Sequence, residues 1–244
     1  MKNILFLIVA LLTLTLSSFG QGLKGSNPPA KPSSFEAENA RAKLAFAAHG
    51  GDKLRALRSL VIRGSVDTTL SAFPQSMPGG FSMVISGEKY RLDIQNAMQS
   101  FKQIYDGRET FCSIRGFTLP PLTSMGLPLL QRLGMQGYTV SNTAATNKKK
   151  NGFRITAPDG AYTDFYLDQK TNQISSYESS FEVNGNIVTT AVEVDRYALV
   201  DGVSVPEKFA QRFDLGQLTA YAQFKAKEIL INKELDDGVF AIGK

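Results

Sequence analysis

The side chains best suited to catalysis or metal binding are scarce in this chain of 244 residues, which has one histidine, His49, and one cysteine, Cys112. A single cysteine cannot form an internal disulfide. One histidine and one cysteine also cannot supply the ligands of a zinc finger or an iron–sulfur cluster. We therefore expect no metal site and no cofactor.

Neither residue lies in a catalytic motif. The sequence has no G-x-S-x-G nucleophile elbow, no P-loop and no G-x-G-x-x-G segment that opens a helix. His49 comes where a first helix should end, and an imidazolium there would interact favourably with the last helix carbonyls. That role is favoured over general-base catalysis, and Cys112 is best interpreted as a small buried hydrophobe. We predict that the protein is not an enzyme.

The charge of the chain is mildly positive, +5 from 27 Lys+Arg and 22 Asp+Glu. The one basic run, Lys148-Lys149-Lys150, lies between expected strands, where a solvated loop is favoured over a docking patch for an acidic partner or a membrane. No RNA-binding motif combines the aromatic and basic residues. We expect no nucleic-acid partner.

The N-terminal stretch has the layout of a secretory signal peptide. Lys2 precedes an apolar run over 4–16, and the small residues Ser18 and Gly20 would occupy positions −3 and −1 of a cleavage site. We expect export to the periplasm with cleavage after about Gly20, and no N-terminal lipid because no cysteine follows the run. An uncleaved anchor is less favoured, since the run is short for a membrane span. The predicted parts are a signal peptide at 1–20, a flexible leader at 21–34 and one domain at 35–244.

The elements that must position the remaining residues are a helix and then a series of strands. Ser33 and Glu36 fit a capping box, and apolar residues at helical spacing follow, with Gly50-Gly51 as a stop: Ala37, Ala40, Leu44, Ala47 and Ala48. From Ser59 the apolar residues alternate with polar ones, which is typical of a half-buried strand. Strand-like runs follow at about 81–94, 100–105, 109–117, 152–157, 161–168, 173–183, 187–200, 208–215 and 218–231.

These runs predict a mainly β (α+β) fold with one large curved sheet. The connections are too short for parallel crossovers, so neighbouring strands must be antiparallel, and full or partial closure into a barrel would limit exposed edges. The stretch 118–136 interrupts the strands and is almost entirely apolar, with Pro128 placed to open a short helix and Gly134 to end it. A connection this apolar must cover something.

The combination of a curved sheet and an apolar cover predicts a binding protein with a lidded chamber. Each buried CH₂ of an acyl chain contributes about 0.8 kcal/mol, so a sixteen-carbon chain gains on the order of ten kcal/mol before ordering costs. The lid's own side chains would fill the chamber when it is empty. The candidate cavity and lid residues are Leu60, Ile62, Met83, Leu119, Leu122, Met125, Leu129, Leu130 and Leu133. For each of them, ordinary core packing is the alternative.

The segment Ala47–Gly64, AAHGGDKLRALRSLVIRG, resembles the helix-to-strand junction of outer-membrane lipoprotein-sorting (LolA/LolB-like) proteins. The order of three further segments is similar: the turn 106–108 before the apolar insert, 206–208 entering a strand pair, and 235–240 after the last strand. The resemblance implies an unclosed β-barrel of about ten or eleven strands, lidded by an N-terminal helix and short inserted helices.

The resemblance also implies a function. Its expected cargo is the acyl chains of lipoproteins or another lipid, carried across the periplasm by a monomer that meets membrane-associated donor and acceptor proteins. An arginine should lock the lid, and Arg63 and Arg91 on the first two long strands are the candidates.

Two other functions stay open. The curved sheet could serve as the scaffold of a structural or interaction protein without a lipid ligand, or the chain could be an unrecognised exported hydrolase.

Overall fold

The computed structural model describes residues 35–97, 100–114, 118–143, 151–183, 186–215, 218–236 and 238–242. Within them, twelve strands form one antiparallel sheet. The strands are β1 (Ser59–Leu70), β2 (Phe73–Ser86), β3 (Lys89–Asn96), β4 (Ser100–Tyr105), β5 (Thr110–Cys112), β6 (Thr139–Ser141), β7 (Gly152–Thr156), β8 (Tyr162–Leu167), β9 (Ile174–Val183), β10 (Asn186–Val200), β11 (Val203–Leu215) and β12 (Leu218–Ile231). The helices are α1 (Glu36–Ala48), α2 (Asp52–Arg55), the 3₁₀ turn η1 (Leu122–Ser124) and α3 (Gly126–Gln131).

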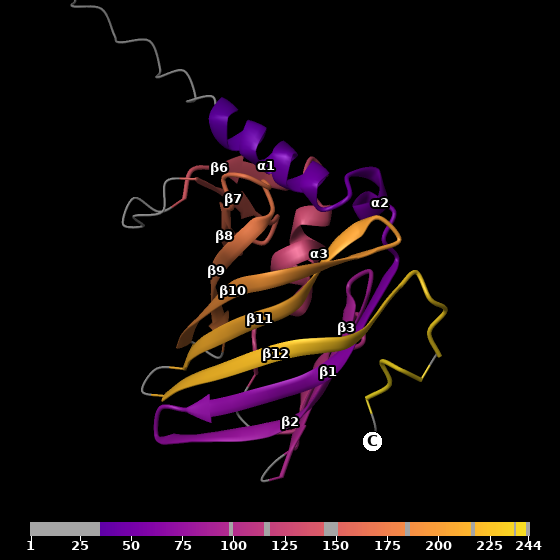
Figure 1. Cartoon of the computed structure of the whole chain (residues 1–244), viewed down its shortest axis with the longest axis vertical. Helices are drawn as coiled ribbons and strands as arrows, with labels where there is room; N and C mark the ends of the chain where they lie inside the picture. Colours follow the sequence, from indigo (N-terminus) through magenta and orange to yellow (C-terminus); the bar gives the residue numbers. More distant parts are fainter. Residues whose placement is uncertain are drawn as a thin grey trace, which may run out of the picture. The chain divides into compact units, whose positions relative to one another are not determined.

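The first and last strands meet in the middle of the sheet. Figure 1 shows β1 beside β12, and the full order is β5-β4-β3-β2-β1-β12-β11-β10-β9-β8-β7-β6. The short strands β5 and β6 are the two edges and do not pair with each other, so the sheet is not closed. The predicted antiparallel, unclosed sheet is confirmed.

The sheet has two more strands than the sequence runs indicated. The run 81–94 contains the end of β2 and the start of β3, separated by a turn at Gly87, where φ is +57°. β6 has three residues and was not expected. β2 also begins earlier, at Phe73, despite Pro74 and Pro78; this part of β2 pairs with β1 alone, because pairing with β3 starts at Gly79. Proline is tolerated on such an unpaired edge.

The inner face of the sheet carries the main hydrophobic core. Leu60, Ile62 and Val66 of β1 belong to it, and Phe224 of β12 stacks on Phe209 of β11 with ring centroids 4.7 Å apart. Figure 1 shows α3 on this inner side of the curved sheet, with α1 and α2 along one end of the strands. Alternate strand residues point to opposite faces, so the neighbours of these core residues face outward.

The outer face has a smaller apolar cluster under the C-terminal segment. Phe240 packs there against Val61, Val84 and Ile104, together with the partly buried Phe111, Leu230, Leu235, Val239 and Ile242. The described C-terminal residues Leu235, Val239, Phe240 and Ile242 therefore cover the outer side of β1 to β4.

α1 buries a different face from the one expected. Ala42 and Ala45 are fully buried, while Leu44 is 50% exposed and Ala37, Ala40 and Ala47 are also exposed. The N-cap residue is Phe35, which makes no side-chain cap, and Ser33 lies outside the described residues, as do the predicted signal peptide and leader. Among the described residues, no helix has the length and apolarity needed to cross a bilayer.

Candidate functional site

The inner face of the sheet and the insert enclose a small apolar cavity of 60 Å³. Its walls come from both halves of the sheet and from the insert: Leu60, Ile62, Met83, Ile85, Leu122, Met125, Gly126, Leu127, Pro128, Tyr177, Val192, Pro206, Phe209 and Gln211. A water molecule occupies about 30 Å³ of liquid volume, so this space holds only a few water-sized molecules. Leu122, Met125 and Leu127 of the insert form one wall of this cavity.

The structure brings most of the predicted cavity and lid residues together. Leu60, Ile62, Met83, Leu122 and Met125 line the cavity. Leu119, Leu129 and Leu130 are buried in the surrounding core, with Leu130 fully inaccessible, and Leu133 packs against that core. α3 begins at Gly126, two residues before Pro128, and Gly134 follows it with a φ of +79°. The apolar stretch 118–133, called the insert below, is thus a cover packed into the concave face.

The end of the insert is held by an arginine that the sequence analysis did not select. The Arg55 guanidinium donates hydrogen bonds to the main-chain carbonyls of Gln131 and Leu133, the latter at 2.6 Å. Its Cζ lies 4.5 Å from the Phe46 ring centroid. Gln131 also binds back to the segment around α2: its side-chain amide donates to the Leu57 carbonyl at 2.6 Å and to the Arg55 carbonyl at 3.1 Å. α1, α2 and the end of α3 are joined at this point.

The two predicted lid-locking arginines lie on the outer face instead. Arg63 pairs with Glu228 at 2.9 Å, and Arg91 pairs with Asp93 at 2.6 Å and donates to the Val239 carbonyl. Arg63 follows Ile62 on β1, and Arg91 pairs with the outward-facing Val84, so strand alternation directs both away from the insert. Of these three arginines it is therefore Arg55, and not Arg63 or Arg91, that contacts the insert. Arg55 lies within the segment 47–64, on which the family resemblance rests.

The start of the insert is held by a buried glutamine. Gln103 of β4 is 1% exposed; its amide nitrogen donates to the Leu119 carbonyl and to the Tyr90 hydroxyl, each at 2.9 Å. The Leu119 N–H donates back to the Gln103 Oε1 at 2.7 Å. Midway along the insert, the Thr163 hydroxyl donates to the Ser124 carbonyl at 3.0 Å. Polar side chains thus hold the backbone of the insert, while its apolar side chains fill the core.

His49 holds the end of α1 against the sheet. It does so as a neutral imidazole, whereas the sequence led us to expect an imidazolium. It is fully buried; Nε2 accepts a hydrogen bond from the Ile174 N–H at 3.1 Å, so Nδ1 carries the proton and donates to the Ser204 carbonyl at 2.9 Å. Burial lowers the pKa of His49, an effect that the hydrogen bond to Ser204 partly offsets. The following Gly50 is required here, since it has a φ of +117° and a Cβ would lie 2.6 Å from the Gly202 carbonyl oxygen. This is a structural contact between α1 and the sheet.

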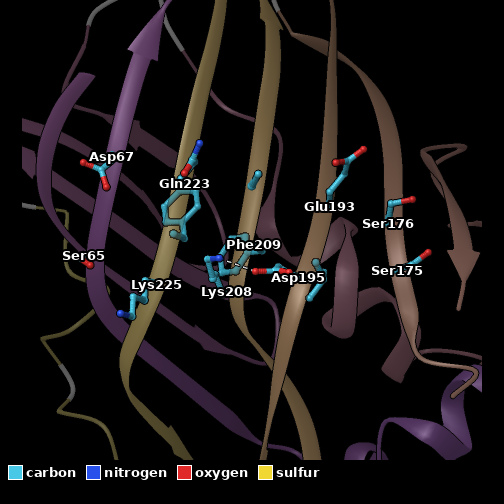
Figure 2. A pocket seen from close by; sticks show the side chains of 13 residues that line it. Ser65, Asp67, Ser175, Ser176, Glu193, Asp195, Lys208, Phe209, Gln223 and Lys225 are labelled. Carbon is cyan, nitrogen blue, oxygen red and sulfur yellow. Dashed lines mark hydrogen bonds and ion pairs between the residues drawn. The ribbon is translucent and has the colours of Figure 1, made fainter. Parts of the chain in front are cut away.

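The outer face of β1 and β9 to β12 carries a larger groove of 580 Å³, in which charged side chains stand beside apolar ones. Figure 2 shows Asp67, Gln223 and Glu193 projecting from it, and Lys208 pairs there with Asp195 at 2.6 Å. An acyl chain in this groove would desolvate these groups without pairing them, which is unfavourable. The inner cavity is therefore the better candidate for an apolar ligand. Among the described residues, no group of three or more His, Cys, Asp and Glu side chains is placed to hold a metal ion.

The fold and the inner site define a class of protein: an unclosed antiparallel β-barrel whose concave face is covered by an apolar insert. No known protein family and no curated protein matches the sequence. The chain is similar in structure to a LolA superfamily protein from Nitrosomonas europaea, with 12% identity, 81% of this chain and 97% of that chain covered, and a TM-score of 0.48.

Two further solved structures are similar. One is a domain named for outer membrane lipoprotein sorting, from Vibrio parahaemolyticus, at 11% identity with 84% and 96% of the two chains covered and a TM-score of 0.43. The other is a DUF1329 family protein from Desulfovibrio piger, at 9% identity with 84% and 97% covered and a TM-score of 0.43.

Proposed function

We propose that the protein is a non-enzymatic carrier that binds acyl chains of lipids or lipoproteins in place of its insert. The observation that carries this proposal is the insert itself: a stretch of leucines and methionines that packs into the concave face of an unclosed sheet and leaves 60 Å³. Loading then requires the insert to move, so ligand uptake and lid opening are coupled.

The energy balance supports an acyl chain as the cargo. Each CH₂ that is buried contributes about 0.8 kcal/mol, so a sixteen-carbon chain supplies on the order of ten kcal/mol toward displacing the insert. The opposing contacts are the packing of side chains such as Leu129 and Leu130 and the main-chain hydrogen bonds from Arg55, Gln103 and Thr163. A chain held this way is protected from water during transit.

The proposal includes the place of action. We propose that residues 1–20 direct export, that 21–34 form a leader, and that the domain 35–244 works as a periplasmic monomer between membrane-associated donor and acceptor proteins. The apolar run of the first segment is the support for this, together with the absence of any cysteine that would be lipidated after it.

Native mass spectrometry and lipid extraction of the full chain, purified from a bacterial periplasm, test the proposal. We expect co-purified lipid, and uptake of a fluorescent fatty acid by the protein after delipidation. An empty protein that takes up no fatty acid would overturn the carrier function and favour the scaffold alternative.

A substitution in the insert tests whether it is a cover. Leu130→Asp places a carboxylate at a fully buried position, so the insert should detach from the concave face. The loss of stability is then limited to the free energy of detaching the insert. Because the detached insert no longer competes for the concave face, fatty-acid affinity should rise at least tenfold while the sheet stays folded. Circular dichroism and fatty-acid binding measure the two effects. Phe224→Asp, within the sheet core, is the comparison; if Leu130→Asp unfolds the sheet equally, the insert is core.

A further inference from the structure

A second cleft lies along the seam where the sheet fails to close. It has two adjoining lobes, of 790 and 530 Å³, which share Tyr90, Thr110, Pro121, Ser124 and Asp159. One side of the cleft comes from β3 to β5, and the other from the β7–β8 turn and the end of β9. This seam cleft is far larger than the 60 Å³ apolar cavity.

The insert is the wall between the seam cleft and the apolar cavity. Thr118, Pro121 and Ser124 line the cleft, whereas Leu122, Met125 and Leu127 line the cavity. The ten residues 118–127 therefore present a mixed surface to the cleft, with Leu119 and Pro121 beside the hydroxyls of Thr118 and Ser124, and an apolar surface to the cavity. When an acyl chain replaces the apolar side of the insert, the nearest polar concavity for the group attached to that chain is the seam cleft.

The charged side chains of the seam cleft indicate which kind of head group the cleft would bind. Arg132 is the one cation among the described lining residues, and it already pairs with Glu88 at 2.8 Å and donates to the Tyr138 hydroxyl at 2.9 Å. The carboxylates of Asp159 and Glu182 form no ion pair with another described residue. An anionic phosphate would meet these carboxylates without a free cation, whereas a positive group would be attracted to them.

Aromatic rings strengthen the same selectivity. Tyr90, Tyr105, Tyr138 and Tyr162 all line the cleft, and the first two rings lie 5.8 Å apart. Amines and quaternary ammonium groups bind to the faces of such rings, most strongly where carboxylates lie nearby. Arg154 and Arg132 already stack on Tyr162 and Tyr138, with Cζ-to-centroid distances of 3.7 and 5.9 Å, so one face of each of these two rings is occupied. Tyr105 is the partly buried ring of the cleft that has no such contact with a described cation.

We propose that the seam cleft binds a positively charged amine or ammonium group carried by the acyl-chain ligand. The proposal rests on the carrier function proposed above and extends it by naming the head group. The tail occupies the concave face after the insert moves, and the head lies across the insert among Asp159, Glu182 and the tyrosines.

Three amphiphiles with the same sixteen-carbon chain test this, each below its micelle concentration: hexadecyltrimethylammonium, palmitate and hexadecyl maltoside. Isothermal titration calorimetry on the delipidated full chain should give an affinity for the ammonium compound about tenfold above that for palmitate, and the preference should shrink in high salt. Asp159→Asn combined with Glu182→Gln should reduce the preference about three- to tenfold. Asparagine can still accept the hydrogen bond that the Asp159 Oδ1 receives from the Ala161 N–H at 3.0 Å, so the turn is retained.

The control removes one carboxylate charge elsewhere on the protein. Glu193→Gln lies in the outer-face groove of Figure 2 and should leave the preference unchanged. Equal binding of the three amphiphiles, tighter binding of palmitate, or the same loss in Glu193→Gln as in the double variant would overturn the seam-cleft proposal and leave the carrier function intact. If none of the three binds, the carrier function fails and the head-group proposal with it.

Discussion

The two ends of the insert are held by opposite kinds of contact. At the start, Gln103 is neutral, 1% exposed and bonded to both the N–H and the C=O of Leu119. At the end, Arg55 is charged, only partly buried and bonded to two carbonyls beside the exposed Gly134. A buried network with every group paired breaks at high cost, whereas a contact near the surface can exchange with water. We infer that the insert hinges at Leu119 and opens at the α3 end.

The largest expected effect is at the hinge. Gln103→Leu removes the partner of the Leu119 N–H and of the Leu119 carbonyl, and one of the two side-chain partners of the Tyr90 hydroxyl. Each buried polar group left unpaired costs about 1–3 kcal/mol, so the free energy of unfolding should fall by about 3 kcal/mol in urea titrations. Gln95→Leu, at an exposed position of β3, should change it by less than about 0.5 kcal/mol. A loss below about 1 kcal/mol for Gln103→Leu would remove the hinge assignment.

Substitutions at the α3 end of the insert should change protease access to that end more than they change the free energy of unfolding. Arg55→Ala deletes two hydrogen bonds to carbonyls at the end of α3, so this end should open more often. We expect trypsin to cleave after Arg132 about tenfold faster, while the free energy of unfolding falls by about 1–2 kcal/mol. Arg58→Ala, at an exposed neighbouring position, is the control. Arg55→Lys should restore the contact only in part, because a lysine cannot span two acceptors with a planar fork. Unchanged cleavage in Arg55→Ala would show that the end is fixed by packing alone.

The His49 contact should make the attachment of α1 sensitive to acid. Burial lowers the pKa of His49 in the folded state below the value of about 6.5 expected for the unfolded chain. Between the two pKa values the unfolded chain binds more protons, so this stabilisation is complete above about pH 6.5 and declines as the pH falls through the folded pKa. Urea titrations from pH 7.5 to 5 should show the decline, and His49→Gln, which does not titrate, should flatten it. An equal decline in His49→Gln would assign the effect to other groups.

The smallest effect is expected at the outer-face arginine once predicted to lock the lid. Arg63 and Glu228 form a pair whose side chains are 54% and 47% exposed, and such pairs contribute about 0–1 kcal/mol. Arg63→Ala should therefore leave trypsin cleavage after Arg132 unchanged and the free energy of unfolding within 1 kcal/mol. Faster cleavage in this variant would show that Arg63 on the outer face also influences the insert. That result would contradict the conclusion that Arg55 holds the end that opens.

The sequence was most informative where a local pattern determines structure. Alternation along Ser59–Leu70 and the turn residues were sufficient to predict the antiparallel sheet, and the apolarity of 118–136 indicated a cover. β6 was missed because three residues are too few to show a period, and the buried face of α1 was misjudged because alanines occur all around that helix. The position of α1 depends on Gly50, His49 and their distant partners, which no local spacing reveals.

The site was predicted by residue type but not by contact. The leucines and methionines of the insert were found because apolar residues in a connection are unusual. Arg55 and Gln103 were missed because their partners are backbone groups 76 to 78 and 16 residues away along the chain, and a carbonyl has no sequence signature. Arg63 and Arg91 were chosen by strand position alone, which does not tell the inner face from the outer.

Hydrogen–deuterium exchange with mass spectrometry, with and without saturating palmitate or another bound sixteen-carbon amphiphile, tests the hinged cover most directly. Peptides covering 126–135 and 118–122 report on the two ends of the insert, and β1 is the internal reference. We predict that ligand binding increases exchange over 126–135 at least tenfold, while Leu119 and β1 stay protected. Exchange that is unchanged at 126–135 in the ligand-bound protein, or that increases equally at both ends, would contradict an insert that opens from α3.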